Sequence, residues 1–134
     1  TAGASVSDSA MVPGYFPEIV RAKALETGKN IRRVFAELIK KGAKIAFGTD
    51  AGVFHHGMNA LEFKYMHELG FAPMDCIKSA TIINAGVLDQ QDKIGSLDQN
   101  KLADIVAVPG DPLKDFSVMQ KPSFVMKEGK IYKE

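Results

Sequence analysis

The sequence has little of the chemistry that builds covalent or cysteine-based sites. It contains one cysteine, Cys76, in 134 residues, which excludes an internal disulfide and a zinc site made of cysteines. Cys76 lies among apolar residues, so we expect a buried thiol rather than a nucleophile. Histidine is scarce as well: the chain has three histidines. Two of them are adjacent.

The sequence also lacks a long apolar run and a strong charge imbalance. No stretch approaches the roughly 18 apolar residues of a membrane-spanning helix. The N-terminal residues have neither the basic start nor the apolar core of a signal peptide. Seventeen basic residues against sixteen acidic ones give a net charge of +1, and the pairs Arg32-Arg33 and Lys40-Lys41 have the spacing of a solvated helix face. We therefore expect no nucleic-acid partner, no membrane association and a cytoplasmic location.

Composition fits a soluble globular chain, with 46% apolar and 25% charged residues. The length of 134 residues suits one modest domain with a real core. Because the sequence begins with Thr1 and not with methionine, we expect a processed chain or a piece of a longer protein.

Apolar spacing predicts several helices in the first two thirds of the chain. Pro17 stands at a plausible first helical position, and we expect that helix to stop at Gly28. A second helix follows the spacing i, i+3, i+4, i+7, i+8 and ends at Gly42. Further helices are expected over residues 59–69 and 73–88. The apolar stripe of the second helix consists of Ile31, Val34, Phe35, Leu38 and Ile39.

A short apolar run bounded by glycines follows the second helix. Residues 44–48 predict a buried strand of a parallel sheet, and this alternation of helix and strand is typical of a wound α/β domain. After residue 88 the pattern changes to short β-type runs at residues 93–97, 103–110 and 124–132. Glu128-Gly129 predicts a tight hairpin turn within the last of them.

The stretch from Lys44 to Asn59 carries the candidate chemistry. Ligands of parallel α/β sheets bind beyond the carboxyl ends of the strands, and Asp50 lies at such an end. A carboxylate there can bind a divalent cation or exchange a proton with water that the cation activates. An aspartate that caps the next helix or closes a turn is at least as consistent with the spacing.

The adjacent histidines do not have the spacing of a metal pair. His55 and His56 point in different directions on any regular element, whereas zinc histidines more often occur as H-x-H on a strand or at i, i+4 on a helix. A substrate contact through one of them and a histidine on a surface loop have comparable weight. We expect a structural role for His67, and Asn59 can cap the helix that it begins.

The succession of motifs carries a family resemblance. "KGAKIAFGTDAG", "HGMNALEFKYMHELGFAPMDCIKSATIINA", "IGSLDQNKLADIVAVPGDPLKDF" and "FVMKEGKIY" together resemble the C-terminal part of amidohydrolase-superfamily enzymes. The chain is most similar to the imidazolonepropionase-related, metal-dependent peptidases that cleave Xaa-Pro or related dipeptides. The likeness covers essentially the whole chain and is strongest from Lys41 onward.

The resemblance implies a fold class and a site. The fold would be α/β: the C-terminal portion of a (β/α)8 metal-dependent hydrolase barrel over residues 1–88, then strands of a small β-sandwich over residues 89–134. In that family the aspartate that closes the eighth barrel strand binds metal and acts as general base, and here it is Asp50. The following loop would lie over the substrate, and its candidate contacts are His56, Gly57 and Asn59.

Several parts of the family pattern are missing from the sequence. The His-x-His of the first strand, a further carboxylate or carboxylated lysine and two later histidines do not occur. Asn100-Lys101-Leu102 precedes Ala103-Asp104 where the family commonly has Gly-Lys, and "VLDQQD" replaces the usual Leu-Gly pair, which questions the turn but not the site. We expect this chain alone to bind metal weakly and to be inactive.

The resemblance implies hydrolysis of an amide or peptide bond in a small-molecule or dipeptide substrate. The cofactor would be a divalent metal, with zinc as the expected ion and one or two ions in the complete enzyme. Two alternatives stay open. One is a non-catalytic chain that only associates, with itself or with a missing N-terminal part, through the stripe of the second helix and an unpaired strand. The other is an amidohydrolase that acts on a cyclic amide or deaminates a ring.

Overall fold

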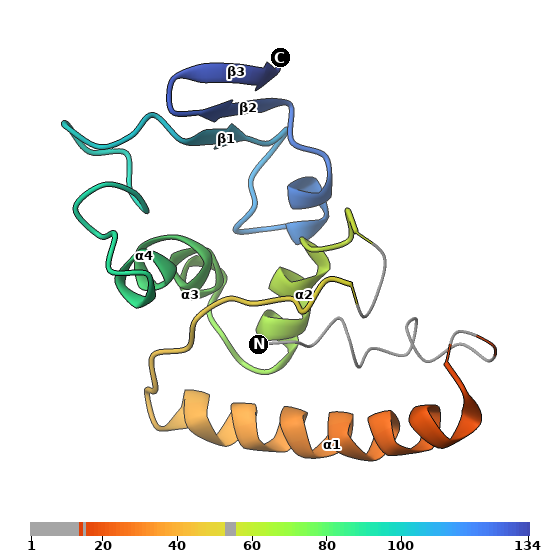
Figure 1. Ribbon diagram of the computed structural model, residues 1–134. Helices are drawn as coiled ribbons and strands as arrows, with labels where there is room; N and C mark the ends of the chain where they lie inside the picture. Colours follow the sequence, from red (N-terminus) through yellow and green to blue (C-terminus); the bar gives the residue numbers. More distant parts are fainter. Residues whose placement is uncertain (1–13, 15, 53–55) are drawn as a thin grey trace.

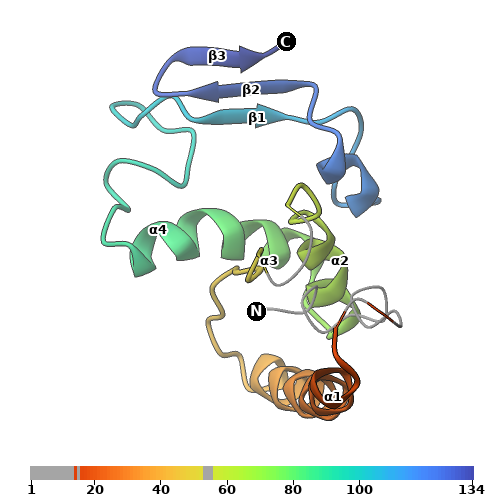
Figure 2. The ribbon, with the colours of Figure 1, turned by 45° about the vertical axis from the view of Figure 1, so that its right-hand side comes forward.

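The computed structural model describes residues 14, 16–52 and 56–134. Figures 1 and 2 show the sheet at one end of the molecule, α1 at the other, and α2 with the helix from α3 to α4 between them. None of the helices in this described part is long and apolar enough to cross a membrane. In chain order the elements are α1 (Glu18–Lys40), α2 (Leu61–Glu68), α3 (Pro73–Lys78), the π-helical turn η2 (Ser79–Ile83), α4 (Asn84–Val87), β1 (Ile105–Ala107), the 3-10 helix η3 (Phe116–Gln120), β2 (Phe124–Lys127) and β3 (Lys130–Lys133).

Helix α1 is one continuous helix of 23 residues where the sequence predicts two. The predicted stop at Gly28 is wrong, because Gly28 lies buried inside the helix. A glycine in a helix interior costs about 0.5–1 kcal/mol relative to alanine, which weakens a helix without ending it. Of the predicted apolar stripe, Phe35 and Ile39 pack against the core, whereas Val34 and Leu38 are exposed.

Three helices end in the same hydrogen-bond pattern. After α1, Gly42 has a φ of 72°, and the amides of Gly42 and Ala43 donate to carbonyls of the last turn at 2.8 and 3.0 Å. This is the Schellman motif, in which a residue with left-handed backbone follows the helix. Helices α2 and α4 end in the same way at Gly70 and Asp89, with φ of 107° and 54°. The "VLDQQD" departure therefore keeps the turn, with an aspartate in the left-handed position that the family gives to glycine.

The core lies where α2 meets α3 and the segment that follows α1. The predicted strand at residues 44–48 is not assigned as a strand, although Ile45 is buried. A strand needs a hydrogen-bonded neighbouring strand, and the described residues provide none for this segment. Residues 93–97 are likewise not a strand. The buried core residues are Ile45, Phe63, Met66, Phe71 and Cys76.

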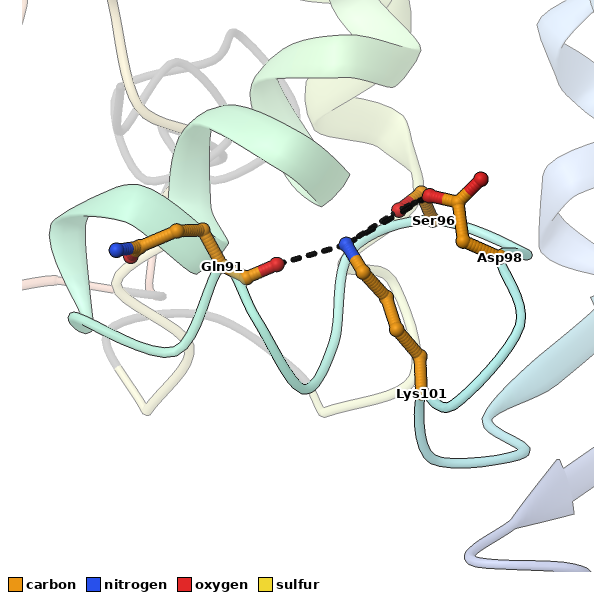
Figure 3. Close-up of polar contacts among 4 residues, drawn as sticks. All are labelled: Gln91, Ser96, Asp98 and Lys101. Atoms are coloured by element: carbon orange, nitrogen blue, oxygen red, sulfur yellow. Dashed lines mark hydrogen bonds and ion pairs between the residues drawn. The ribbon is translucent and has the colours of Figure 1, made fainter.

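The loop between α4 and β1 is organised around Lys101 (Figure 3). The Lys101 ammonium donates to the Gln91 carbonyl oxygen at 2.7 Å and to the Ser96 hydroxyl at 2.6 Å. It also lies 3.7 Å from the carboxylate of Asp98, to which the Ser96 hydroxyl donates. Asn100 precedes this lysine with a φ of 70°, a conformation that asparagine tolerates better than most residues. The second departure from the family pattern is thus also accommodated by the backbone.

The C-terminal sheet is antiparallel in the order β1-β2-β3. Glu128 and Gly129 join β2 to β3 with φ of 52° and 79°. Positive φ at both central residues is the signature of the type I′ hairpin turn, so the predicted hairpin is confirmed. The amide of Glu128 donates to the Asp104 carboxylate at 2.7 Å, which fixes the hairpin to the residue just before β1.

Replacing Gly95 by alanine should destabilise the protein through a direct clash. A Cβ on Gly95 would lie 2.7 Å from the Cβ of Ala85 and 3.1 Å from the Thr81 carbonyl oxygen, at a φ of +92°. We expect Gly95→Ala to lower the free energy of unfolding by about 2–4 kcal/mol, measured by urea denaturation. Gly129→Ala is the matched control, since its φ is +79° and nothing lies within 4 Å of its Cβ. Equal losses in the two variants would contradict the packing argument.

Candidate active site

Asp50 lies at the end of the core segment and is exposed to solvent. Its φ of 55° puts it in the left-handed region, which costs an L-residue about 1–2 kcal/mol. The alternative that it caps the next helix is excluded, because α2 begins with Ala60 as its N-cap and has no side-chain cap bond. Within the described part of the chain, its carboxylate makes no hydrogen bond or ion pair. Because Asp50 is exposed, its carboxylate is accessible to a ligand.

Asn59 braces the loop that follows Asp50. Its Oδ1 accepts a hydrogen bond from the Gly57 amide at 3.2 Å, and its Nδ2 donates to the Thr49 hydroxyl at 3.3 Å. The side chain thus connects the residue just before Asp50 to the far end of the loop. The expectation that Asn59 caps α2 is wrong, since its carboxamide is used within the loop instead. Gly57 has a φ of 91°, a conformation that suits glycine.

The histidines lie in different surroundings. His56 is exposed beside Gly57, in the loop predicted to face the substrate, whereas His55 lies outside the described residues. The Nδ1 of His67 is 2.8 Å from the Phe71 carbonyl oxygen, so Nδ1 carries the proton and donates it. The His67 ring also meets the edge of Phe116 at 5.8 Å between centroids. These contacts support the structural role expected for His67.

Asn84 holds the segment that leads to Asp50, a role that the sequence patterns did not predict. Its Oδ1 accepts from the amide of Phe47 at 3.1 Å, and its Nδ2 donates to the Phe47 carbonyl oxygen at 3.0 Å. The Phe47 amide also lies 3.3 Å from the Ser79 carbonyl oxygen. The available signal was a carboxamide within a mostly apolar helical stretch, "SATIINAGV".

Glu62 is another residue that the sequence patterns did not single out. It lies in the first turn of α2 and is 0% exposed. A carboxylate near the N-terminus of a helix is stabilised by the helix dipole. The signal that could have marked it is an asparagine, Asn59, followed three residues later by glutamate, the spacing of a capping box.

The described residues fit a metal centre only in part. The exposed carboxylate of Asp50 is an oxygen donor of the kind that divalent cations bind. Among residues 14, 16–52 and 56–134, no group of three or more histidine, cysteine, aspartate or glutamate side chains could hold an ion. Asp50 therefore suits one ligand position, and a complete coordination shell needs donors from elsewhere.

The model of the amidohydrolase family matches residues 8–132, so the chain belongs to the amidohydrolase family. Members of this family are generally metal-dependent. The α/β fold expected from the sequence is confirmed at this level, as helices followed by a small antiparallel sheet that matches amidohydrolase structures.

Individual relatives support the same family. The structure of a Xaa-Pro dipeptidase with methionine bound in its active site is 45% identical, has a TM-score of 0.89, and is matched over 98% of this chain and 32% of that protein. Ochratoxinase from Aspergillus niger is 36% identical over 107 residues, which are 75% of this chain and 22% of the ochratoxinase. A prolidase complexed with N-methylphosphonate-L-proline, 23% identical with a TM-score of 0.82, shares the fold over 97% of this chain and 34% of its own. The chain thus spans about a third or less of the length of these relatives.

The single thiol lies outside the candidate site and should be inert. Cys76 is fully buried, and burial, followed by the charge of Asp75, raises the pKa of its thiol from 9.0 to about 11. At pH 8 we expect the folded protein to react with an aromatic disulfide reagent about a hundredfold more slowly than the urea-unfolded protein. Because the folded pKa is the higher one, the stability that this group contributes is complete below pH 9 and is lost as the pH rises toward 11. Equal rates in the folded and unfolded protein would show that the thiol is accessible.

Proposed function

We propose that this chain is the C-terminal segment of a metal-dependent amidohydrolase that hydrolyses an amide or peptide bond, with dipeptides as the substrate class. The observation that carries the proposal is the exposed carboxylate of Asp50, with its left-handed backbone, at the end of a core segment. The likeness to a Xaa-Pro dipeptidase at 45% identity favours a dipeptide over other amides. The ligand bound in the active site of that relative, methionine, is itself an amino acid.

Asp50 has two tasks in this proposal. Its carboxylate would supply one oxygen ligand to a divalent ion, for which we propose zinc, and the ion when bound activates water and polarises the substrate carbonyl. One Asp50 oxygen accepts the proton of the attacking water and returns it to the leaving nitrogen as the amide bond breaks. Because Asp50 is exposed, its oxygens are accessible both to a metal ion and to the proton of the attacking water. The other ligands of the ion would come from residues outside this chain.

The loop after Asp50 would bind the substrate. His56 is exposed, so its imidazole can donate to a carboxylate or carbonyl group of a dipeptide. Asn59 uses one donor and one acceptor of its carboxamide within the loop, which leaves a second N–H and a second lone pair for substrate. Gly57 lies between them and has no side chain, so the substrate can approach the backbone closely. We therefore assign His56, Gly57 and Asn59 to the substrate side of the site.

Replacing Asp50 by asparagine in the complete enzyme should abolish most of its activity. Asparagine keeps the size of the side chain but cannot accept the proton, so we expect kcat for dipeptide hydrolysis to fall by about two to four orders of magnitude. The matched control is Asp89→Asn, since Asp89 is also exposed and has a φ of 54° against 55° for Asp50. Steady-state kinetics of both variants provide the measurement. A near-normal kcat in Asp50→Asn would exclude the assigned role.

Association is the second candidate, and exposed apolar side chains favour it. They occur on α1, around α4 and on the sheet, and in a chain alone they would contact water. Such surfaces are commonly covered by further protein, either a second copy or the rest of an enzyme. The most exposed are Ile19 at 82%, Leu97 at 76%, Val87 at 69%, Leu88 and Tyr132 at 63%, and Val106 at 62%.

The isolated 134-residue chain should therefore self-associate. We expect sedimentation velocity at micromolar concentration to give species larger than the 14.5 kDa monomer, with no stoichiometric zinc in the purified material. Leu97→Lys and Val87→Lys together should shift the distribution toward monomer, because both side chains are highly exposed. A monomer with one sharp unfolding transition would contradict association, and one zinc ion per chain would favour a site completed between copies.

A further inference from the structure

We propose that Asn84 is a positioning residue for Asp50. Its carboxamide takes the place of a neighbouring strand beside Phe47 and so fixes the course of the segment that ends at Asp50. The catalytic consequence rests on the function proposed above. Figure 2 shows this segment running from α1 past the helix that continues from α3 to α4.

The contact between Asn84 and Phe47 has the pattern of a strand pair. The N–H of Phe47 donates to Oδ1 at 3.1 Å, and Nδ2 donates to the carbonyl oxygen of Phe47 at 3.0 Å. Two such bonds between one carboxamide and one residue close a ring, as the two bonds of a hydrogen-bonded pair do in an antiparallel ladder. Residues 43–50 have no ladder partner among the described residues, so this ring is the substitute.

Few side chains can replace the carboxamide. Asparagine offers a donor and an acceptor side by side, whereas an ionised aspartate only accepts and a leucine does neither. The contact is partly buried, so a lost partner leaves the backbone of Phe47 with an unsatisfied polar group, which is costly. The length of the side chain also matters, because both bonds need the amide at one distance from the helix.

The helix that carries Asn84 has an unusual geometry just before it. The π-helical turn η2 (Ser79–Ile83) separates α3 from α4, and such turns occur frequently at functional sites. The carbonyl oxygen of Ser79, at the start of this turn, lies 3.3 Å from the Phe47 amide. Both ends of η2 therefore meet the same residue of the core segment, since Asn84 directly follows the turn.

Two carboxamides hold the approach to Asp50. Asn84 fixes the backbone at Phe47, and Asn59 fixes the hydroxyl of Thr49 at 3.3 Å. Asp50 follows directly, with a left-handed backbone that needs support from its surroundings. Because a misplacement of about 1 Å at a reacting group can lower a rate about a hundredfold, the clamp at Phe47 affects the reaction without touching substrate.

The test uses the complete enzyme that contains this chain, with Asn84→Asp and Asn84→Leu as variants. We expect faster amide hydrogen exchange in residues 44–50 and a kcat about tenfold to a hundredfold lower, with KM near the wild-type value. Asn84→Gln keeps the carboxamide on a longer side chain and should recover part of the rate. Thr81→Val is the control, since the Thr81 hydroxyl donates only to the Ile77 carbonyl oxygen of its own helix at 2.8 Å. It should change neither exchange nor kcat.

Several results would overturn the proposal. They are wild-type kcat in Asn84→Asp and Asn84→Leu, an equal loss in Thr81→Val, or unfolding of all three Asn84 variants, which would assign Asn84 to stability alone. If the wild-type enzyme hydrolyses no dipeptide, the function proposed above fails instead. Hydrogen exchange in residues 44–50 then decides the clamp by itself, and unchanged exchange in the Asn84 variants would refute it.

Discussion

The backbone of Phe47 is hydrogen-bonded to a side chain, and the candidate site depends on that contact. A core segment outside any sheet has to satisfy its N–H and C=O groups in some other way, because a buried polar group without a partner is costly. Asn84 meets this need at Phe47, and the buried side chain of Ile45 anchors the same segment in the core. Asp50 then leaves the core at a defined point. Packing at Ile45 and hydrogen bonding at Phe47 together set the direction of the chain. This direction brings the side chain of Asp50 to the surface.

Left-handed backbone positions give the rest of the fold its turns. Gly42 and Gly70 end helices in this conformation, and Asp89 does the same at the position where the resemblance implies glycine. Asn100 precedes Lys101 in the same region of φ, and the lysine then fixes the loop through Gln91 and Ser96. At both departures from the pattern that the resemblance implies, the residue in place of glycine has a positive φ. Aspartate and asparagine are the residues for which this exchange is least costly.

Much of the local structure could be predicted from the sequence, because its causes are local. The hairpin at Glu128-Gly129 follows from turn chemistry, and Gly42 and Gly70 mark helix ends by their freedom in φ. Gly28 shows the limit of this reasoning, since the packing around a long helix outweighs one weak residue. The predicted strand at residues 44–48 is wrong because its formation also depends on tertiary structure. Its apolar pattern predicts burial correctly, but a ladder depends on neighbours that the pattern does not describe.

The residues of the candidate site could likewise be predicted only where the cause is local in the sequence. Asp50 could be proposed as a site residue from its place after an apolar run, and its exposure agrees with that proposal. The spacing alone does not distinguish a ligand from a cap, because both place an aspartate after an apolar segment, and the structure excludes the cap. Asn84 lies 37 residues beyond Phe47, and no local pattern connects the two.

The distribution of hydrogen bonds around Asp50 also supports a site that is completed by groups outside this chain. A carboxylate used only to hold a loop would be satisfied by backbone amides, as Asp104 is by Glu128 and Asp115 is by Ser117. Asp50 has no such contact in the described part of the chain, while its neighbour Thr49 is held by Asn59. Among the described residues, the local hydrogen bonds are therefore made by neighbours of Asp50 and not by its carboxylate. That distribution is what a ligand for a metal or a base for water requires, since either task needs lone pairs that no internal donor occupies.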